Sequence, residues 1–202
     1  MWFFPAAVGA EMSDFPELYI LRHGETEWNA QGRMQGALNS PLTPTGREQA
    51  ERQASILAQC DLSGFDIISS PQGRAFETAG IALARQVSHI RTDDGLREIG
   101  VGLWAGRLRS DLSQGTDITE GPDGALALYE RAPEGEGFPA LEQRCEAFLE
   151  TISRPSVLIT HGITSRMLRC IVTGVGPAGL EDIGGGQGVV FHLKNRLQKR
   201  LE

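Results

Sequence analysis

Apolar runs of strand length recur along this chain. They lie at 18–21, 65–70, 157–160 and 189–193, and a weaker run lies at 87–92. The run at 18–21 is continuously apolar, as expected for a strand that is covered on both faces. We therefore expect these runs to be strands of a buried sheet.

Helical patterns fill the intervals between the runs, at 43–60, 73–86, 141–153 and 163–174. The first pattern begins with Thr43 as an N-cap and Pro44 in the first turn. The second spaces Phe76 and Leu83 on one face, and the last ends at Gly174, a residue that commonly ends helices. Strand alternating with helix predicts an α/β fold, with a mostly parallel sheet and helices on both faces.

The segment 102–139 breaks this alternation. It is rich in Gly, Pro, Asp and Glu and shows only short helical pieces, such as 124–132. We interpret it as a short lid insertion, a usual place for substrate selection. Residues 1–17 are expected to form a loose extension, which leaves 18–202 as a single domain. The extension lacks a basic start and a long apolar run, so it predicts neither a signal peptide nor a membrane span.

Composition narrows the possible partners. The chain has 202 residues and a net charge of −7, which argues against a nucleic-acid partner and against an anionic membrane surface. Cys60, Cys145 and Cys170 are far apart and odd in number, so we expect free thiols in a reducing compartment, the cytoplasm. Composition leaves the oligomeric state undetermined.

Residues that can carry chemistry follow three of the predicted strands. Arg22 and His23 follow the first strand, Arg74 begins the helix after the second, and His161 follows the strand at 157–160. Glu98 comes shortly after the weak strand. Because ligands of open α/β sheets bind beyond the carboxyl ends of the strands, we expect both histidines to face one cleft.

This set of side chains suits a phosphate monoester. Arginine matches the dianion with a planar, permanently charged fork, and a neutral imidazole can attack phosphorus. A second imidazole can donate hydrogen bonds to the phosphoryl oxygens, and a glutamic acid can protonate the leaving oxygen. No pair of histidines has the spacing of metal ligands with a carboxylate nearby, so no metal site is expected.

The same motifs resemble the histidine phosphatase superfamily, the phosphoglycerate-mutase-like group named for its Arg-His-Gly signature. The resemblance rests on "LRHGETEWN", "GRMQGALNSPLTPTGREQA", "SSPQGRAFETA", "LREIGVGLWAG" and "THG", in that order, and covers about residues 18–193. It implies a three-layer α/β sandwich with no metal and no organic cofactor.

The resemblance also implies roles for individual residues. His23 corresponds to the nucleophile, phosphorylated on Nε2, and Glu98 corresponds to the general acid. The other matching positions belong to the phosphate pocket or lie near the substrate: Arg22, Arg74, His161, Asn29, Thr26, Gln35 and Gly36.

Some positions depart from the family pattern. Gly137 stands where a Gly-Glu-Ser loop often has its serine, and no tandem arginines lie between Glu98 and His161. These departures weigh against a mutase. We therefore expect a metal-independent phosphatase acting on a small phosphate monoester. The alternatives are a phosphoglycerate mutase and a non-catalytic phosphate-recognition module. A sugar phosphate, phosphoglycerate, a nucleotide or a cobalamin-precursor phosphate would each satisfy the central pocket.

Two assignments have an alternative in which the residues are solvated charges without a functional role. Glu98 is close to Asp93 and Asp94, so it also fits a solvated run of charges. Arg107 and Arg109 in the lid fit anion binding and a solvated face equally well.

Overall fold

A six-stranded sheet forms the centre of the protein. The structure, a computed structural model, describes residues 15–114 and 124–202. The strand order is β3-β2-β4-β1-β5-β6. Strands β3, β2, β4 and β1 pair in parallel, whereas β5 pairs antiparallel with both of its neighbours, β1 and β6. The bounds are β1 Leu18–Arg22, β2 Asp66–Ser69, β3 Arg91–Thr92, β4 Ser156–Thr160, β5 Val190–Lys194 and β6 Leu197–Leu201.

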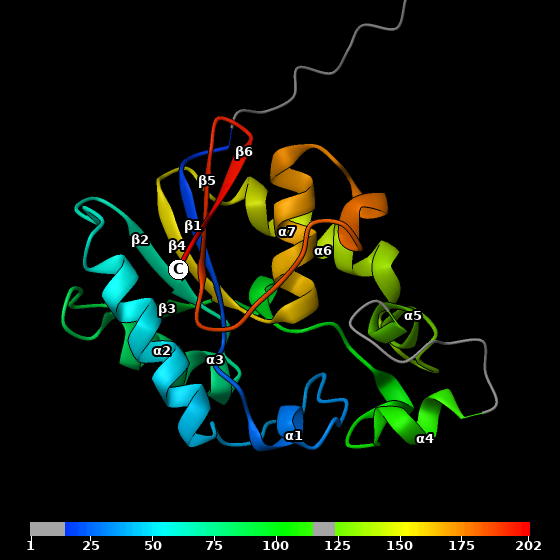
Figure 1. Ribbon diagram of the computed structural model, residues 1–202. Coiled ribbons are helices and arrows are strands. Elements are labelled where there is room, and N and C mark those ends of the chain that lie inside the picture. Colours follow the sequence, from blue (N-terminus) through cyan, green and yellow to red (C-terminus); the bar gives the residue numbers. More distant parts are fainter. Residues whose placement is uncertain (1–14, 115–123) are drawn as a thin grey trace, which may run out of the picture.

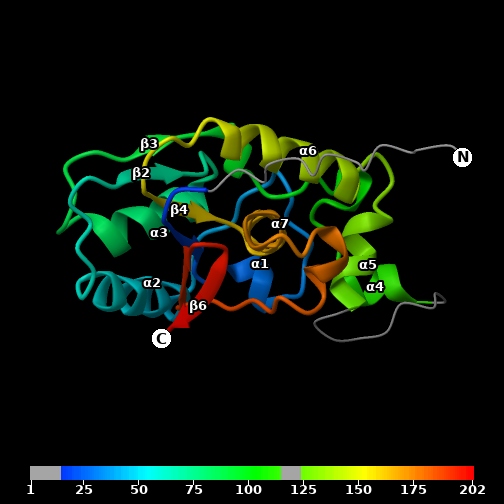
Figure 2. The same ribbon diagram turned by 90° about the horizontal axis from the view of Figure 1, so that it is seen from above.

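Helices cover both faces of this sheet (Figures 1 and 2). On one face α2 (Pro44–Leu57) and α3 (Gly73–Leu83) share a core with Tyr19 and Leu21 of β1. On the other face α6 (Gly137–Glu150) and α7 (Gly162–Thr173) share a core with Leu18 and Ile20. Successive residues of a strand point to opposite faces, so a continuously apolar strand serves both cores. The expected three-layer α/β sandwich is confirmed.

Helix ends follow their local signals. The Thr43 hydroxyl accepts a hydrogen bond from the Gly46 amide at 3.0 Å, and Pro44 opens α2. Helix α7 ends at Gly174, whose φ of +79° places it in the left-handed region. Helix α6 begins at Gly137, four residues before the expected start at 141, so the lid segment 102–139 overlaps its first turn.

The buried face of α3 differs from the expected one. Phe76, which we placed on the apolar stripe with Leu83, is 46% exposed. The buried positions include Ala75, Ala79 and Ala82, which pack in the same core as residues of α2. Small side chains let the two helices approach closely, so the large ring of Phe76 is left on the solvent side.

Two edge strands differ from the sequence prediction. The weak run at 87–92 contributes only Arg91 and Thr92 to a strand. Strand β6 was not expected, because its side chains are exposed along most of its length and give no apolar run. It pairs with β5 through a tight turn in which Asn195 and Arg196 both have positive φ, a geometry that matches hairpin twist.

The lid lies beside α1 (Glu27–Ala30), at the end of the sheet where β1 leads into that helix (Figure 1). Its described helices are α4 (Arg109–Ser113) and α5 (Gly124–Glu130), while 115–123 lies outside the described residues. The Met34 amide donates to the Arg107 carbonyl at 3.0 Å, so the loop after α1 is joined to the lid. The short 3₁₀ helices are η1 Asp94–Leu96, η2 Gly102–Trp104 and η3 Pro177–Leu180.

The end of the expected N-terminal extension belongs to the domain. Of residues 1–17, only 15–17 are described. Phe15 packs against the core, and the Glu17 carbonyl accepts a hydrogen bond from the Ser156 amide at 3.0 Å. The domain therefore begins a few residues before 18. No helix of the described part of the chain is long and apolar enough to cross a membrane.

Candidate active site

Three parallel strands bring the candidate residues to one rim of the sheet. Arg22 ends β1 and is paired with Thr160 at the end of β4. The His23 amide then donates to the Thr160 carbonyl at 3.0 Å, which sets His23 beside His161. The two imidazole rings have their centroids 5.1 Å apart at an interplanar angle of 61°. Arg74, in the first turn of α3 after β2, contacts His23 as well. These residues, far apart in sequence, form one site.

His23 is held as a neutral imidazole with a defined tautomer. Its Nδ1 lies 2.6 Å from the Gly24 carbonyl oxygen, so Nδ1 carries the proton and donates it. Its Nε2 accepts a hydrogen bond from Arg74 Nε at 3.3 Å, so Nε2 has a lone pair. Burial lowers the pKa of His23 well below its usual value, and the charges of Arg22 and Arg74 lower it further. His23 lines a cavity, so a neutral imidazole forms part of its wall.

His161 has one ring nitrogen without a partner among the described residues. Its Nε2 lies 2.8 Å from the Ser70 hydroxyl, while its buried Nδ1 has no hydrogen-bond partner. Burial lowers the pKa of His161 well below its usual value, and the charge of Arg74 adds to this effect. His161 contacts the cavity residue His23 but is not itself among the residues that line the cavity. Ser70 was missed from the sequence, although a hydroxyl directly after a strand was a visible signal.

The two arginines of the site differ in how they are held. Arg74 is 1% exposed, and its guanidinium donates to the Leu38 carbonyl at 2.7 Å and to the Gly36 carbonyl at 3.0 Å. Arg22 makes no side-chain hydrogen bond to the described residues, and its Nε is buried. Burial lowers the pKa of both guanidinium groups, which reflects the cost of removing a cation from water. A bound anion would offset this cost, chiefly at Arg22.

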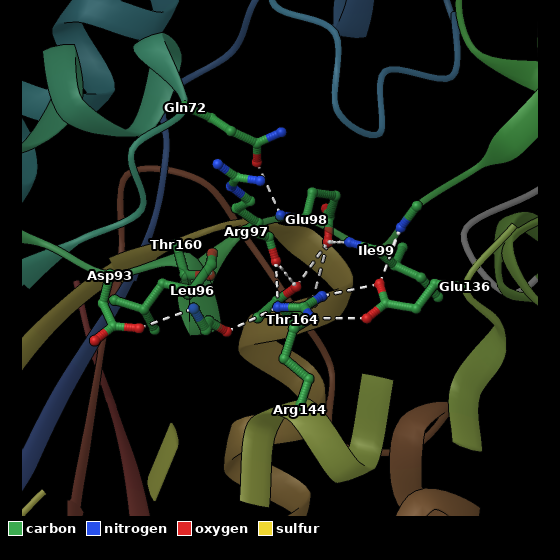
Figure 3. A network of polar contacts seen from close by, with 12 residues as sticks. Gln72, Asp93, Leu96, Arg97, Glu98, Ile99, Glu136, Arg144, Thr160 and Thr164 are labelled. Atoms are coloured by element: carbon green, nitrogen blue, oxygen red, sulfur yellow. Dashed lines mark hydrogen bonds and ion pairs between the residues drawn. The ribbon is translucent and has the colours of Figure 1, made fainter. Parts of the chain in front are cut away.

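Glu98 is seated at the N-terminus of α7 (Figure 3). One carboxylate oxygen accepts hydrogen bonds from the amides of Gly162 at 2.9 Å and Ile163 at 3.3 Å. The other accepts from the amide and the hydroxyl of Thr164, both at 3.1 Å. A helix N-terminus favours a negative charge, so these donors fix the position of the carboxylate. Glu98 is only 9% exposed, so the alternative that it belongs to a solvated run of charges with Asp93 and Asp94 is wrong.

The backbone at Gly162 lies close to Arg22 and Glu98, although a Cβ there would still make only ordinary van der Waals contacts. A Cβ at this position would lie 3.4 Å from Cζ of Arg22 and 3.6 Å from a carboxylate oxygen of Glu98. The backbone of the second His-Gly pair therefore lies directly against both charged groups. The glycine of the first pair is different, because a Cβ at Gly24 would collide with the backbone of Gly46 in α2.

Residues outside the expected set hold the segment that carries Glu98 (Figure 3). Gln72 accepts a hydrogen bond from the Glu98 amide at 2.8 Å. Arg144 of α6 pairs with Glu136 through two contacts, at 2.7 and 2.9 Å, and donates to the carbonyls of Gly95 and Arg97. The sequence contains no signal for the roles of Gln72 and Arg144. Glu136 had one, because it occupies the glutamate position of the family's Gly-Glu-Ser loop.

The remaining expected positions divide into two kinds. Asn29, Gln35 and Gly36 line the same cavity as His23. Thr26 does not line it and instead caps α1, where its hydroxyl accepts from the Asn29 amide at 3.2 Å and from Gln35 Nε2 at 2.7 Å. Thr26 therefore contacts two cavity residues without reaching the cavity itself.

The glycine-rich loop at 184–188 adds a contact that the sequence did not predict. Gln187 Nε2 donates to the His23 carbonyl at 3.2 Å and to Asn29 Oδ1 at 3.4 Å. Arg169 of α7 donates to the Gly184 carbonyl at 2.7 Å and so fastens the loop. The loop is thus both the turn before β5 and part of the cavity wall, to which Gly185 and Gly186 contribute.

The cavity has a volume of about 160 Å³ and a strongly cationic lining. Among the described residues, Glu98 is the sole acidic side chain of the lining, whereas six arginines contribute to it: Arg22, Arg33, Arg74, Arg109, Arg166 and Arg169. In the same described part of the chain, no group of three or more His, Cys, Asp and Glu is arranged to hold a metal ion. In a protein of net charge −7, this local excess of positive charge selects for a small anion.

Known proteins resemble this chain over nearly its whole length. Residues 18–198 match the histidine phosphatase superfamily (branch 1). A probable phosphoglycerate mutase, GpmB, of Escherichia coli O1:K1 is 35% identical over 163 residues, which span 78% of this chain and 73% of that protein.

Solved structures show the same fold. The alpha-ribazole phosphatase of Shigella flexneri superimposes with a TM-score of 0.73 at 28% identity and covers 92% of this chain and 94% of its own. A mycobacterial glucosyl-3-phosphoglycerate phosphatase gives a TM-score of 0.71 at 28% identity, covering 89% and 92%. Fold, motif order and the match over 18–198 agree, and the chain belongs to the histidine phosphatase superfamily, branch 1.

Proposed function

We propose that this protein is a metal-independent phosphatase that hydrolyses a small phosphate monoester through a phosphohistidine at His23. The observation that carries the proposal is the neutral His23, which has its lone pair on Nε2 and lines a cationic cavity. The volume of about 160 Å³ supports a small substrate, because pockets for drug-sized ligands are typically about 300–1,000 Å³. All three cysteines are free thiols, which supports a cytoplasmic location.

In the first step, His23 Nε2 attacks phosphorus and the bond between phosphorus and the leaving oxygen breaks. Arg22 and Arg74 balance the charge of the phosphoryl oxygens, and His161 donates Nδ1–H to one of them. Glu98 gives a proton to the leaving oxygen, which departs as an alcohol. The products of this step are the alcohol, phosphohistidine and the Glu98 carboxylate.

In the second step, water attacks the phosphohistidine. The Glu98 carboxylate takes a proton from the water as the new P–O bond forms and the P–N bond breaks. Inorganic phosphate leaves, and His23 is neutral again. The amides at the start of α7 keep the Glu98 oxygens in place through both steps, because their positions belong to the helix backbone.

The proposal is tested by following the phosphoryl group. Purified protein with EDTA is offered a panel of phosphomonoesters whose phosphate is ³²P-labelled. We expect phosphate release and an acid-labile label on the wild-type chain, and neither on His23→Ala, because no other nucleophile replaces Nε2. Circular dichroism of the variant checks that it folds. Turnover by His23→Ala, or the absence of both release and label in the wild type across the panel, would contradict the proposal.

Phosphoglycerate mutase is a second candidate, because one relative at 35% identity carries that name. A mutase returns the phosphoryl group to another hydroxyl of its substrate instead of to water. With 3-phosphoglycerate as substrate, NMR separates the two activities, since a mutase accumulates the isomer and a phosphatase accumulates glycerate and phosphate. We expect phosphate to be the main product with the preferred substrate.

A further inference from the structure

We propose that the substrate carries a second oxyanion, apart from the phosphate that reacts, and that Arg109, Arg166 and Tyr129 hold it. The proposal rests on the proposed function, since it names the substrate class of the same cavity. It concerns the part of the cavity lining contributed by the lid and by the second turn of α7. The occupant is a carboxylate or a second phosphate group on a small phosphate monoester.

The first argument is the state of the lining arginines. Arg74 and Arg169 have their donors directed at carbonyl groups and neighbouring side chains, and Arg33 donates to the Gly106 carbonyl and to Gln31. None of the six lining guanidinium groups forms an ion pair with a carboxylate of the described residues, and three of them make at most one side-chain hydrogen bond there: Arg22, Arg109 and Arg166. Arg22 lies next to His23 and serves the reacting phosphate, so Arg109 and Arg166 are the two lining cations with donors left for another anion.

Arg109 has a buried donor with no partner. Its Nε is buried and makes no hydrogen bond to the described residues, while its Nη2 donates to the Tyr129 hydroxyl at 3.4 Å. A buried, unpartnered N–H group is costly, so a water, an ion or a ligand commonly satisfies it. Tyr129 is 8% exposed and lines the cavity with Arg109, so its hydroxyl is available to the same ligand.

Arg166 is the third residue of the proposed subsite, and it comes from α7 instead of the lid. It lies on α7, lines the cavity, and uses Nη1 to donate to the Leu180 carbonyl at 3.0 Å. Its other guanidinium nitrogens lie against Gly185, where an added Cβ would be 3.3 Å from Nη2. Arg166 is thus held in place by the backbone, with no carboxylate of the described chain to neutralise it.

Charge balance favours a second anion. The six lining arginines carry six positive charges, of which an ionised Glu98 offsets one. A phosphate monoester brings between one and two negative charges at neutral pH, which leaves at least three positive charges uncompensated. The charges of Arg109 and Arg166 act unfavourably on Arg22, so these groups repel one another until an anion lies among them. A second oxyanion within the cavity removes most of this repulsion.

The lid offers a matched control. Arg107 and Arg109 were equivalent in the sequence, but Arg107 is exposed and does not line the cavity, whereas Arg109 does. Arg107→Gln removes the same charge two residues away and leaves the cavity unchanged. The comparison of the two variants therefore separates a direct contact from a general change in charge.

Binding of phosphonates tests the proposal without turnover. Phosphonoacetate, 3-phosphonopropionate and 4-phosphonobutyrate are each compared with the alkyl phosphonate of the same chain length, and propane-1,3-bisphosphonate tests a second phosphate group. We expect at least one ligand with an anionic tail to bind roughly ten- to a hundredfold more tightly than the matching phosphonate with an uncharged tail, as charge-assisted hydrogen bonds allow. Calorimetry at fixed ionic strength measures the dissociation constants.

The variants then locate the subsite. Arg109→Gln should remove most of the preference for an anionic tail, while the affinity for the phosphonate with an uncharged tail stays within about twofold of the wild-type value. Arg107→Gln should keep the wild-type preference. Arg166→Gln, at a half-buried position of α7, is the second variant and should lower the same preference. Equal affinity for charged and neutral tails, or an equal loss for both in Arg109→Gln, would overturn the inference.

The two proposals fail in different ways. If the wild type hydrolyses phosphomonoesters and labels His23 but shows no preference for a second oxyanion, the phosphatase stands and the subsite falls. If the charged-tail phosphonates bind with the expected preference but no substrate is turned over, the subsite stands as a binding site and the phosphatase falls.

Discussion

His23 and His161 show how burial sets the charge of a functional side chain. Both imidazoles are at most 2% exposed, and Arg22 and Arg74 lie beside them. Burial and neighbouring positive charge act in the same direction on an imidazole, so both histidines are neutral in the folded protein. A neutral ring has the lone pair that a nucleophile needs, and this property comes from the surroundings and not from the residue type.

The neutral histidines make stability depend on pH. Their pKa is well below 6.5 in the folded state and about 6.5 in the unfolded state, so below pH 6.5 the unfolded chain binds protons that the folded chain does not. The free energy of unfolding should therefore fall as the pH drops below about 6.5, by up to about 1.4 kcal/mol per pH unit for each histidine. Urea unfolding at several pH values measures the slope.

His161→Gln tests the origin of this slope. The amide can keep a contact with Ser70 but cannot titrate, so the slope between pH 6.5 and 5 should become shallower. His89 is exposed in a loop, and His89→Gln is the control for the substitution itself. A slope in His161→Gln equal to that of the wild type would show that other groups cause the pH dependence.

At the scale of elements, the position of Glu98 depends on three segments that are distant in sequence. The N-terminus of α7 binds its carboxylate, and Gln72, before α3, accepts from its amide. Arg144 on α6 joins Glu136 to the carbonyls of Gly95, within η1, and Arg97, directly after it. Arg144 is thus a positioning residue, because it touches the segment of Glu98 and not the cavity.

Arg144→Met should impair the proton transfer that we assign to Glu98. We expect kcat/KM to fall roughly tenfold for an alkyl phosphate and much less for p-nitrophenyl phosphate, whose leaving group needs little protonation. Glu98→Gln gives the reference pattern for a lost proton donor. Steady-state rates on the two substrates measure the difference.

Arg97→Met is the matched control for Arg144→Met. The Arg97 side chain is 54% exposed and pairs with Asp94 on the surface, so its loss should change neither rate by more than about twofold. Equal losses on both substrates in Arg144→Met would indicate a general structural defect and contradict the positioning role.

At the scale of the whole molecule, charge is distributed unevenly. The chain carries a net charge of −7, yet one small cavity gathers six arginines from its described residues. Partly desolvated cations that face one another reduce the stability of the unliganded protein. The molecule therefore has a stability cost at the place where an anion binds.

Inorganic phosphate should accordingly stabilise the protein. At a phosphate concentration of one hundred times its dissociation constant, binding adds about 2.7 kcal/mol to the free energy of unfolding. For a chain of this size that corresponds to a rise in Tm of about 5–10 °C. Differential scanning calorimetry with and without phosphate measures the shift.

Sodium chloride at equal ionic strength is the control for this shift, because it screens the arginines without filling the cavity. Arg107→Gln should keep the full shift, since Arg107 is exposed and outside the lining. A rise in Tm of the same size in chloride and in phosphate would mean that screening, and not a bound anion, stabilises the protein.

The sequence by itself determined the elements whose signals are local. Continuous apolar runs defined β1 and β4, and Thr43 with Pro44 defined the start of α2. The order of these elements predicted the parallel sheet, and the rule for strand ends placed Arg22, His23, Arg74 and His161 at one rim. These features depend on neighbours in the chain or on a general rule of topology, so they can be predicted from the sequence.

The tertiary structure alone decided the features that arise when distant segments meet. The buried face of α3, the partners of Glu98 and the contact of Gln187 with His23 depend on packing between elements, which leaves no periodic signal in the sequence. The difference between Arg107 and Arg109 is of the same kind, because exposure follows from the path of the lid. The candidate residues could be identified from their type and their place in the sequence. Their charge states, their hydrogen-bond partners and their access to the cavity depend on packing.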